Sequence, residues 1–519
     1  MSAEIPAKHS SEFALWTALR FLREHGIVFI LISALLLIPC FWHRHIQAGD
    51  LGSHVYNAWL AQLIEHHQLS GLVIAQQWNN VLFDLLLLHA GNSFGWVAAE
   101  RIVVSLAVLV FYWGSFSFVS AISRRSAWLL APLLLVLSYG YVFHMGFFNF
   151  YLSLGLAWFV IAIALHGGAG NWLVAMLLAA LSLLAHPIGF LLGIAVTAYI
   201  LVWKELGSKW RMALPVLAGI LWFLLRLYFA AHDAFEAGWR TSGFLQVLGQ
   251  DQLNLFGRRY LLLSCVALAW GLWCALGAVY DWIFRGKVAA DSVQLCAELY
   301  LVALIATVCL PENLRTSVYA GWIGLLVSRL TLVTAIFGVA LLGSLRLPRW
   351  SSYGFIIVAL VFFAFGYQDT GKLDAMETSA RAAMEKLPVG TRVVAVANPP
   401  DGWRIEFIHH SIERACIGRC FSYANYEPSS QQFRVRALPG CYVVAGSAEE
   451  SESMSSGDYI VQKSDLPLTS IYQCDEADFT ALCAMPLRAG QKTEDPEADP
   501  ASSPLSEPRS ANPQPKSTN

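Results

Sequence analysis

The chain has 519 residues, of which 56% are hydrophobic and 13% are charged, and its formal net charge is −2 at pH 7. This apolar composition lies outside the usual range of soluble globular proteins, so the sequence predicts a mainly α-helical protein of the membrane. The near-neutral charge excludes nucleic acid as a partner, because nucleic-acid binding requires a basic face or stripe.

The first apolar run, at 27–43, follows an N-terminal segment, residues 1–26, that carries Lys8, Arg20 and Arg23. No small-residue cleavage site comes after the run, which distinguishes it from a signal peptide. We therefore expect an uncleaved first membrane span.

Ten further apolar segments follow, and runs of about 18 apolar residues with few charges are typical of membrane helices. The expected polytopic bundle occupies residues 27–367 and has about eleven spans. The short segments 171–185 and 188–203, divided by His186 and Pro187, could instead form one re-entrant hairpin. The expected spans are 27–43, 97–122, 127–143, 149–166, 171–185, 188–203, 212–231, 260–284, 293–310, 320–343 and 351–367.

The loops between these segments predict the orientation, because Lys and Arg accumulate in short cytoplasmic loops. Arg258 and Arg259 beside the eighth span and Arg44 beside the first go against the trend. We expect a cytoplasmic N-terminus, with the first loop and the C-terminal domain on the outer side. The cations on the expected inner side are Arg124, Arg125, Lys204, Lys209, Arg211, Arg285, Lys287, Arg346 and Arg349.

The first outer loop, with an interfacial helix, spans 44–96 and contains the sequence QAGDLGSH from Gln47 to His54. Apolar residues recur from Ser53 to Leu63 with helical spacing, which indicates a helix lying flat on the membrane surface. Asp50 and His54 are four residues apart and can share a face of that helix.

Asp50 has two interpretations. A carboxylate held partly away from water has a raised pKa, which suits a general base, and it also suits a divalent metal ion, the only cofactor that the sequence suggests. The alternative is that Asp50 is the N-cap of the surface helix, with Gly52 and Ser53 completing the turn.

The layout from 27 to 367, with an acidic residue before an amphipathic helix in the segment Asp50–Leu63, resembles the GT-C superfamily of membrane glycosyltransferases. The resemblance implies hexosyl transfer from a polyprenyl-phosphate carrier to an acceptor outside the membrane, with Asp50 as the essential carboxylate and His54 as a supporting group. The sugar and the acceptor stay undetermined. The next outer loop departs from the family, because its sequence HMGFFN offers His144 and Asn149 but no second acid. A metal site would then need a replacement ligand, and the candidates are His144, His186, Asp233 and Glu236.

Two arginines, Arg226 and Arg329, fall inside expected spans, where an unpaired charge is costly. Each could bind the phosphate of the lipid carrier through paired hydrogen bonds. The alternatives are an internal ion pair or a side chain that stretches to the interface. His144, His186 and Asn149 are further candidates for substrate contact; a hydrogen-bonded histidine without such a role is the alternative.

After Tyr367 the composition changes, and residues 368–489 are expected to form an outward α+β domain that helps to dock the acceptor. Residues 374–386 indicate a helix, and 390–397 and 441–445 indicate strands. The tail, residues 490–519, is rich in Pro and Ser and is expected to be disordered. The stretch from Phe421 to Ala437 is similar to bacterial membrane proteins, which indicates a bacterial inner membrane.

Five of the ten cysteines lie in the C-terminal domain. Cys416 with Cys420 and Cys474 with Cys483 are expected to form disulfides in an oxidising compartment, which leaves Cys441 single. A zinc site is the alternative, although a four-residue spacing without a second close pair suits structural zinc poorly.

The sequence contains no GxxxxGK[ST], no HExxH and no dinucleotide-binding glycine pattern, so ATP-driven or nicotinamide chemistry is not expected. Besides the glycosyltransferase, a transporter or flippase-like carrier and a non-catalytic membrane protein remain alternatives. A transporter should show two related halves with broken helices, which are not evident.

Overall fold

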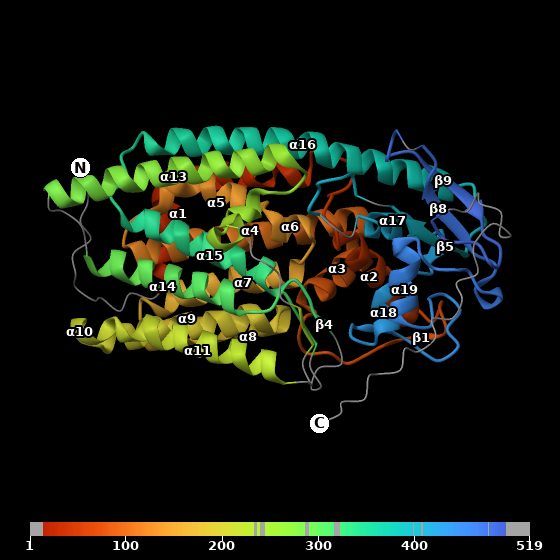
Figure 1. Cartoon of the computed structure of the whole chain (residues 1–519), viewed down its shortest axis with the longest axis horizontal. Helices are drawn as coiled ribbons and strands as arrows, with labels where there is room; N and C mark the ends of the chain where they lie inside the picture. Colours follow the sequence, from red (N-terminus) through yellow and green to blue (C-terminus); the bar gives the residue numbers. More distant parts are fainter. Residues whose placement is uncertain are drawn as a thin grey trace, which may run out of the picture.

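In a computed structural model the protein is mainly helical (Figure 1). The structure describes residues 14–232, 236–238, 244–285, 290–315, 322–397, 399–405, 408–475 and 477–494. Within these ranges nine helices are long and apolar enough to cross a membrane, which is compatible with an integral membrane protein.

Each of the eleven expected segments overlaps a helix. Two of these helices, α7 and α8, have only 17 residues, so the count of eleven spans stays a prediction. The helices of the bundle are α1 (Ala14–Leu37), α4 (Trp96–Ser123), α5 (Ala131–Ser138), α6 (Tyr141–His144), α7 (Phe148–Ala164), α8 (Ala169–Ala185), α9 (Pro187–Glu205), α10 (Ser208–Arg211), α11 (Ala213–Ala231), α12 (Phe244–Leu248), α13 (Arg258–Arg285), α14 (Ala290–Cys309), α15 (Leu326–Ser344) and α16 (Ser351–Met384).

Helix α7 is the buried centre of the bundle and packs against α4, α8 and α9. Small residues allow this close packing: a Cβ added to Gly114 on α4 would lie 2.3 Å from the carbonyl oxygen of Gly155 on α7. The indole of Trp158 stacks on Phe118, with ring centroids 4.6 Å apart. Backbone proximity and aromatic stacking therefore fix α4 against α7.

The last apolar segment was expected to end at residue 367, but its helix extends further. Helix α16 continues without a break from Ser351 to Met384, so the separate helix expected at 374–386 is its second half. At 1.5 Å per residue, its 34 residues extend about 51 Å, longer than a bilayer core of about 30 Å. Figure 1 shows α16 running from the bundle to the strands at the far end of the molecule.

A four-stranded sheet lies at that end, in the order β6-β5-β8-β9. β5 is parallel to β6 and β8, whereas β9 is antiparallel to β8. β5 coincides with the strand expected at 390–397. The strand expected at 441–445 is wrong, because residues 443–445 are buried but have no ladder partner; Ala445 N donates a single bond to Tyr423 O, at 2.8 Å. The strands are β5 (Thr391–Val396), β6 (Cys420–Ser422), β8 (Thr469–Gln473) and β9 (Leu482–Pro486).

Short elements complete the C-terminal segment and the loops. An antiparallel pair joins β1 to β7, and a second small sheet has the order β2-β3-β4. The short elements are α17 (His410–Ala415), α18 (Tyr426–Ser430), α19 (Ala448–Ser456), β1 (Leu72–Ile74), β2 (Glu236–Gly238), β3 (Asn313–Arg315), β4 (Trp322–Ile323), β7 (Val435–Ala437), and the 3-10 turns η1 (Ile38–Cys40), η2 (Ala127–Leu130), η3 (Gln250–Leu253) and η4 (Lys463–Asp465).

Both expected terminal segments are shorter than the sequence indicated. Helix α1 begins at Ala14, within the expected segment 1–26. Residues 490–494 pack against the C-terminal segment, where Gly490 N donates to Val461 O at 2.9 Å and Thr493 N to Tyr459 O at 3.0 Å. The remaining terminal residues, 1–13 and 495–519, lie outside the described residues.

The loop at 44–96 contributes α2 (Leu51–Glu65) and α3 (Leu82–Phe94), which lie between the bundle and the C-terminal segment (Figure 1). Helix α2 is not a surface helix with one buried face. Ten of its residues are buried, because α3 covers one side and α17 another. A Cβ on Gly52 would lie only 1.9 Å from the carbonyl oxygen of His410, so only glycine allows α17 to pack this closely.

Candidate functional site

The loop before α2 is held by the backbone of residues 144–146. Gly49 N donates to His144 O at 2.7 Å, and Asp50 N donates to Met145 O at 3.0 Å. Gly146 has a φ of +83°, and a Cβ at this position would lie 2.4 Å from the nitrogen of Asp50. The loop at 44–96 and the backbone at 144–146 are therefore joined at the residue that the sequence singled out.

Asp50 occupies the N-cap position of α2, but its side chain makes no capping hydrogen bond. Its Oδ1 lies 3.4 Å from Nε2 of His410 on α17, and 16% of the side chain is exposed. Oδ1 has no hydrogen-bond partner among the described residues. The carboxylate thus points at the C-terminal segment, and its buried Oδ1 lies beside His410 without a hydrogen bond.

His54 lies one turn along α2 and binds a carboxylate that the sequence analysis missed. Its Nδ1 is 2.6 Å from Oδ1 of Asp84, in the first turn of α3. The other oxygen of Asp84 accepts a hydrogen bond from Asn149 at 2.8 Å, and Asn149 Oδ1 accepts from Phe83 N at 2.9 Å. Asn149 therefore positions Asp84, and Asp84 orients His54.

The His54–Asp84 pair changes the charge state of the imidazole. Burial lowers the pKa of His54, but the carboxylate of Asp84 outweighs it and raises the pKa to about 9. His54 is therefore a cation at neutral pH. It lies in the electrostatic field of Asp50 and of Glu427, a residue of α18.

Three buried groups from the C-terminal segment complete this arrangement. Burial raises the pKa of Glu427 to about 8 and that of Glu413 to about 7, and it lowers the pKa of His410 to about 4. Glu427 accepts a hydrogen bond from Ser53 of α2 at 3.1 Å. Near neutral pH, Glu427 can donate a proton, whereas the imidazole of His410 is neutral.

Arg329 of α15 reaches the same place from the bundle. Its Cζ lies 4.0 Å from the centroid of the Phe147 ring, and its buried Nε has no hydrogen-bond partner among the described residues. Asp50, Tyr426 and Glu312 are among the groups whose charge acts on it. The guanidinium therefore keeps hydrogen-bonding capacity for an anion. We call Asp50, His54, Asp84, Arg329, His410 and Glu427 the Asp50 cluster.

A buried ion-pair triad fixes α17 beside this cluster. Arg414 on α17 contacts Glu100 of α4 at 2.9 Å and Glu377 of α16 at 2.5 Å. Arg414 also donates to Ile46 O at 3.0 Å. Arg414 lies one turn after His410, so the triad fixes the C-terminal segment to two bundle helices next to His410.

The other predicted residues have structural contacts. His186 caps α9, since its Nδ1 accepts from Ile188 N at 3.2 Å. The buried ring of His144 packs edge-on against Phe256, with centroids 5.2 Å apart. Arg226 is not brought into the cluster: it is half-buried on α11 and donates to Val308 O at 3.0 Å. Their proposed contacts with substrate stay predictions.

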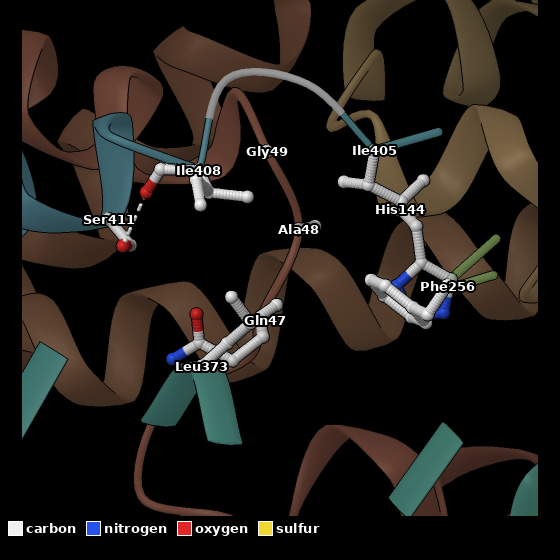
Figure 2. A pocket seen from close by; sticks show the side chains of 9 residues that line it. All are labelled: Gln47, Ala48, Gly49, His144, Phe256, Leu373, Ile405, Ile408 and Ser411. Carbon is white, nitrogen blue, oxygen red and sulfur yellow. Dashed lines mark hydrogen bonds between the residues drawn. The ribbon is translucent and has the colours of Figure 1, made fainter. Parts of the chain in front are cut away.

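A small pocket lies beside the Asp50 loop, lined by Gly49, His144, Ile405, Ile408 and Ser411 among others (Figure 2). Its volume is about 10 Å³, which is about the space of one water molecule. None of the residues that line it belongs to the Asp50 cluster, and a sugar would not fit in it.

The described residues contain no group of three or more His, Cys, Asp or Glu side chains that could hold a metal ion. Of the replacement ligands, Asp233 lies outside the described residues, and Glu236 is placed only as backbone in β2. A divalent metal at Asp50 thus stays a prediction.

The two expected disulfides are present. Cys416 is bonded to Cys420 and Cys474 to Cys483, whereas Cys441 is free. The first disulfide is buried against Met384 at the end of α16.

Sequence alone could have pointed to Asp84, which opens a helix in the same loop as Asp50. Nothing local marks Glu427 or His410, which lie more than 350 residues from Asp50. No protein-family model matches the chain, no curated protein is significantly similar to it in sequence, and no solved structure is significantly similar to it.

Proposed function

We propose that the protein is a membrane glycosyltransferase of the GT-C type, which transfers a hexose from a polyprenyl-phosphate carrier to an acceptor outside the membrane. The observation that carries the proposal is the Asp50 carboxylate. It lies at the end of a helical bundle, makes no helix cap and has one oxygen without a hydrogen-bond partner among the described residues.

The surrounding charges fit the bond changes of this reaction. The acceptor hydroxyl would give its proton to Asp50 while its oxygen attacks the anomeric carbon, and the bond from that carbon to the phosphate oxygen would break. The leaving polyprenyl phosphate is an anion. The cationic His54 and Arg329 would stabilise its charge, since both interact electrostatically with the site of Asp50.

The proposal includes the topology expected from the sequence: eleven spans, a cytoplasmic N-terminus and an outward C-terminal segment in a bacterial inner membrane. Two features support it. Each of the eleven segments overlaps a helix, and α2, α3 and the C-terminal sheet lie at one end of the bundle (Figure 1). A lipid-borne donor could therefore meet an acceptor from the aqueous phase at this end.

Substitution of Asp50 tests the proposal. The purified protein is incubated with a panel of radiolabelled polyprenyl-phosphate hexoses, and release of polyprenyl phosphate is measured. We expect Asp50→Asn to lower turnover by about 10²-fold or more, the usual effect of losing a general base. The control is Asp458→Asn, because Asp458 is 73% exposed. A thermal melt verifies that both variants fold.

Two results would overturn the proposal. If the wild type releases polyprenyl phosphate from no donor of the panel, the transporter and non-catalytic alternatives are favoured. If Asp50→Asn keeps full turnover, Asp50 has no part in the mechanism. A chelator distinguishes the two possible roles of Asp50. If EDTA abolishes activity and a divalent ion restores it, Asp50 is a metal ligand. If EDTA leaves activity unchanged, Asp50 is a base.

A further inference from the structure

A second, larger cavity lies away from the Asp50 cluster, as a groove between the end of α1 and the first half of α4. Its volume is about 740 Å³, within the range of about 300–1,000 Å³ that is typical of small-molecule sites. Its walls are mostly apolar, and Phe41, Phe94, Val97 and Ile102 are exposed there. On a helix that crosses a membrane, such side chains face lipid.

Arg101 is the charged residue that lines this groove. Its Nη2 donates to the carbonyl oxygen of Arg44 at 3.1 Å and to that of His43 at 3.4 Å. The main chain therefore holds the guanidinium, and its remaining N–H groups stay available. Arg44 does not line the groove, but it is exposed and its carbonyl oxygen contacts Arg101, so a second cationic residue adjoins the groove.

Carboxylates do not balance these charges. Within the described residues, neither Arg101 nor Arg44 forms an ion pair, and the neighbouring Glu100 is buried on Arg414 at 2.9 Å. A cation near membrane depth is costly without a counter-charge. Arginine binds phosphate through paired hydrogen bonds, and basic pockets between membrane helices bind anionic lipid headgroups.

We propose that this groove binds an anionic diacyl phospholipid, with an acyl chain along the apolar face of α4 and the headgroup phosphate on Arg101 and Arg44. The occupant is a membrane phospholipid and not the lipid-linked sugar, because none of the residues that line the groove belongs to the Asp50 cluster. The bound phospholipid holds α1 against α4. The proposal does not depend on glycosyl transfer.

Native mass spectrometry tests this site on the full-length protein in detergent. Phosphatidylglycerol, phosphatidylcholine and undecaprenyl phosphate are titrated separately, and bound lipid is counted. We expect phosphatidylglycerol to bind about tenfold more tightly than phosphatidylcholine. The double variant Arg101→Gln/Arg44→Gln should weaken phosphatidylglycerol binding at least about fivefold, and Arg101→Lys should retain more of the affinity than Arg101→Gln, since it keeps the charge.

Two further variants separate the groove from general effects. Ala98→Trp keeps both arginines but fills the groove, so it should also lose the tightly bound phosphatidylglycerol. Arg349→Gln removes an exposed arginine at the other end of the bundle and should leave binding unchanged. Equal affinity for the two phospholipids, unchanged binding in the double variant or in Ala98→Trp, or displacement of phosphatidylglycerol by equimolar undecaprenyl phosphate would each refute the proposal. Failure of glycosyl transfer would not affect any of these outcomes.

Discussion

The buried triad of Arg414, Glu100 and Glu377 gives the sharpest test of how the C-terminal segment is fixed. The side chains of all three residues are at most 4% exposed. Replacing Arg414 by Met removes the positive charge, leaves Glu100 without an ion-pair partner among the described residues, and leaves Glu377 with only the more distant Arg381, at 3.7 Å. Breaking a buried ion pair from one side costs about 3–5 kcal/mol, which lowers the ratio of folded to unfolded protein on the order of 10²–10⁴-fold.

The same argument predicts a rescue. Because uncompensated charge causes most of this cost, the triple variant Arg414→Met/Glu100→Gln/Glu377→Gln should recover most of the lost stability. The surface pair of Lys492 and Asp458 is the control. It is 3.7 Å apart and largely exposed, so Lys492→Met should cost no more than about 0.5 kcal/mol.

The free energy of unfolding is measured by SDS titration of the purified protein in mixed micelles, with tryptophan fluorescence as the signal. A cost below about 1 kcal/mol for Arg414→Met would show that water or a rearranged partner compensates the carboxylates. A triple variant no more stable than the single variant would refute uncompensated charge as the cause.

Three further changes test the packing and charges around Asp50. Gly52→Ala should lower the thermal midpoint, at a cost of about 1–3 kcal/mol, because its Cβ would collide with the carbonyl of His410; Gly207→Ala, with open space around it, should not. The pKa of His54 is about 9 in the fold against an ordinary 6.5, so its ion pair stabilises fully below pH 6.5 and is lost as the pH rises through 9. The difference in thermal midpoint between the wild type and His54→Gln should therefore shrink as the pH rises from about 6 to about 10. Under mild reduction, alkylation should label the exposed Cys474 before Cys416, which is fully buried; the reverse order would contradict the packing at Met384.

Apolar periodicity predicted the helices well, because a long run of apolar residues has few other stable states in a bilayer. It failed where the apolar run ends. The segment after Tyr367 becomes polar, and the sequence therefore indicated a new domain, but α16 continues to Met384 without a break. A change in the surroundings of a helix changes which side chains are tolerated, but it does not by itself end the helix.

The strand expected at 441–445 failed for another reason. Val443 and Val444 are buried, as β-branched residues in a strand would be. Nevertheless, a strand requires a neighbouring strand in register, and this requirement is invisible in a short local pattern. β5 could be predicted, because its six residues lie in the middle of the sheet and are mostly buried.

For the site, sequence reasoning found the residues of one loop and missed their partners. Asp50 and His54 are four positions apart, so helical spacing was enough to group them. Asp84 pairs with His54 across two helices, and Glu427 approaches from the C-terminal segment. Such contacts depend on the tertiary fold, which no spacing rule over one sequence can recover.

The C-terminal segment forms a wall of the Asp50 cluster, and its expected part in docking an acceptor stays a prediction. Its contacts with the loop at 44–96 are internal: β1 pairs with β7, and Asn57 and Asn425 exchange hydrogen bonds at 2.8 and 3.3 Å. The hydroxyl of Tyr56 accepts from Ser422 N at 2.9 Å. Buried polar groups such as these lose their partners if the segment is removed, and each loss costs about 1–3 kcal/mol. His410 and Glu427 come from the same segment, so residues from both halves of the chain form the Asp50 cluster. Truncation of the chain before β5 should therefore destroy the cluster.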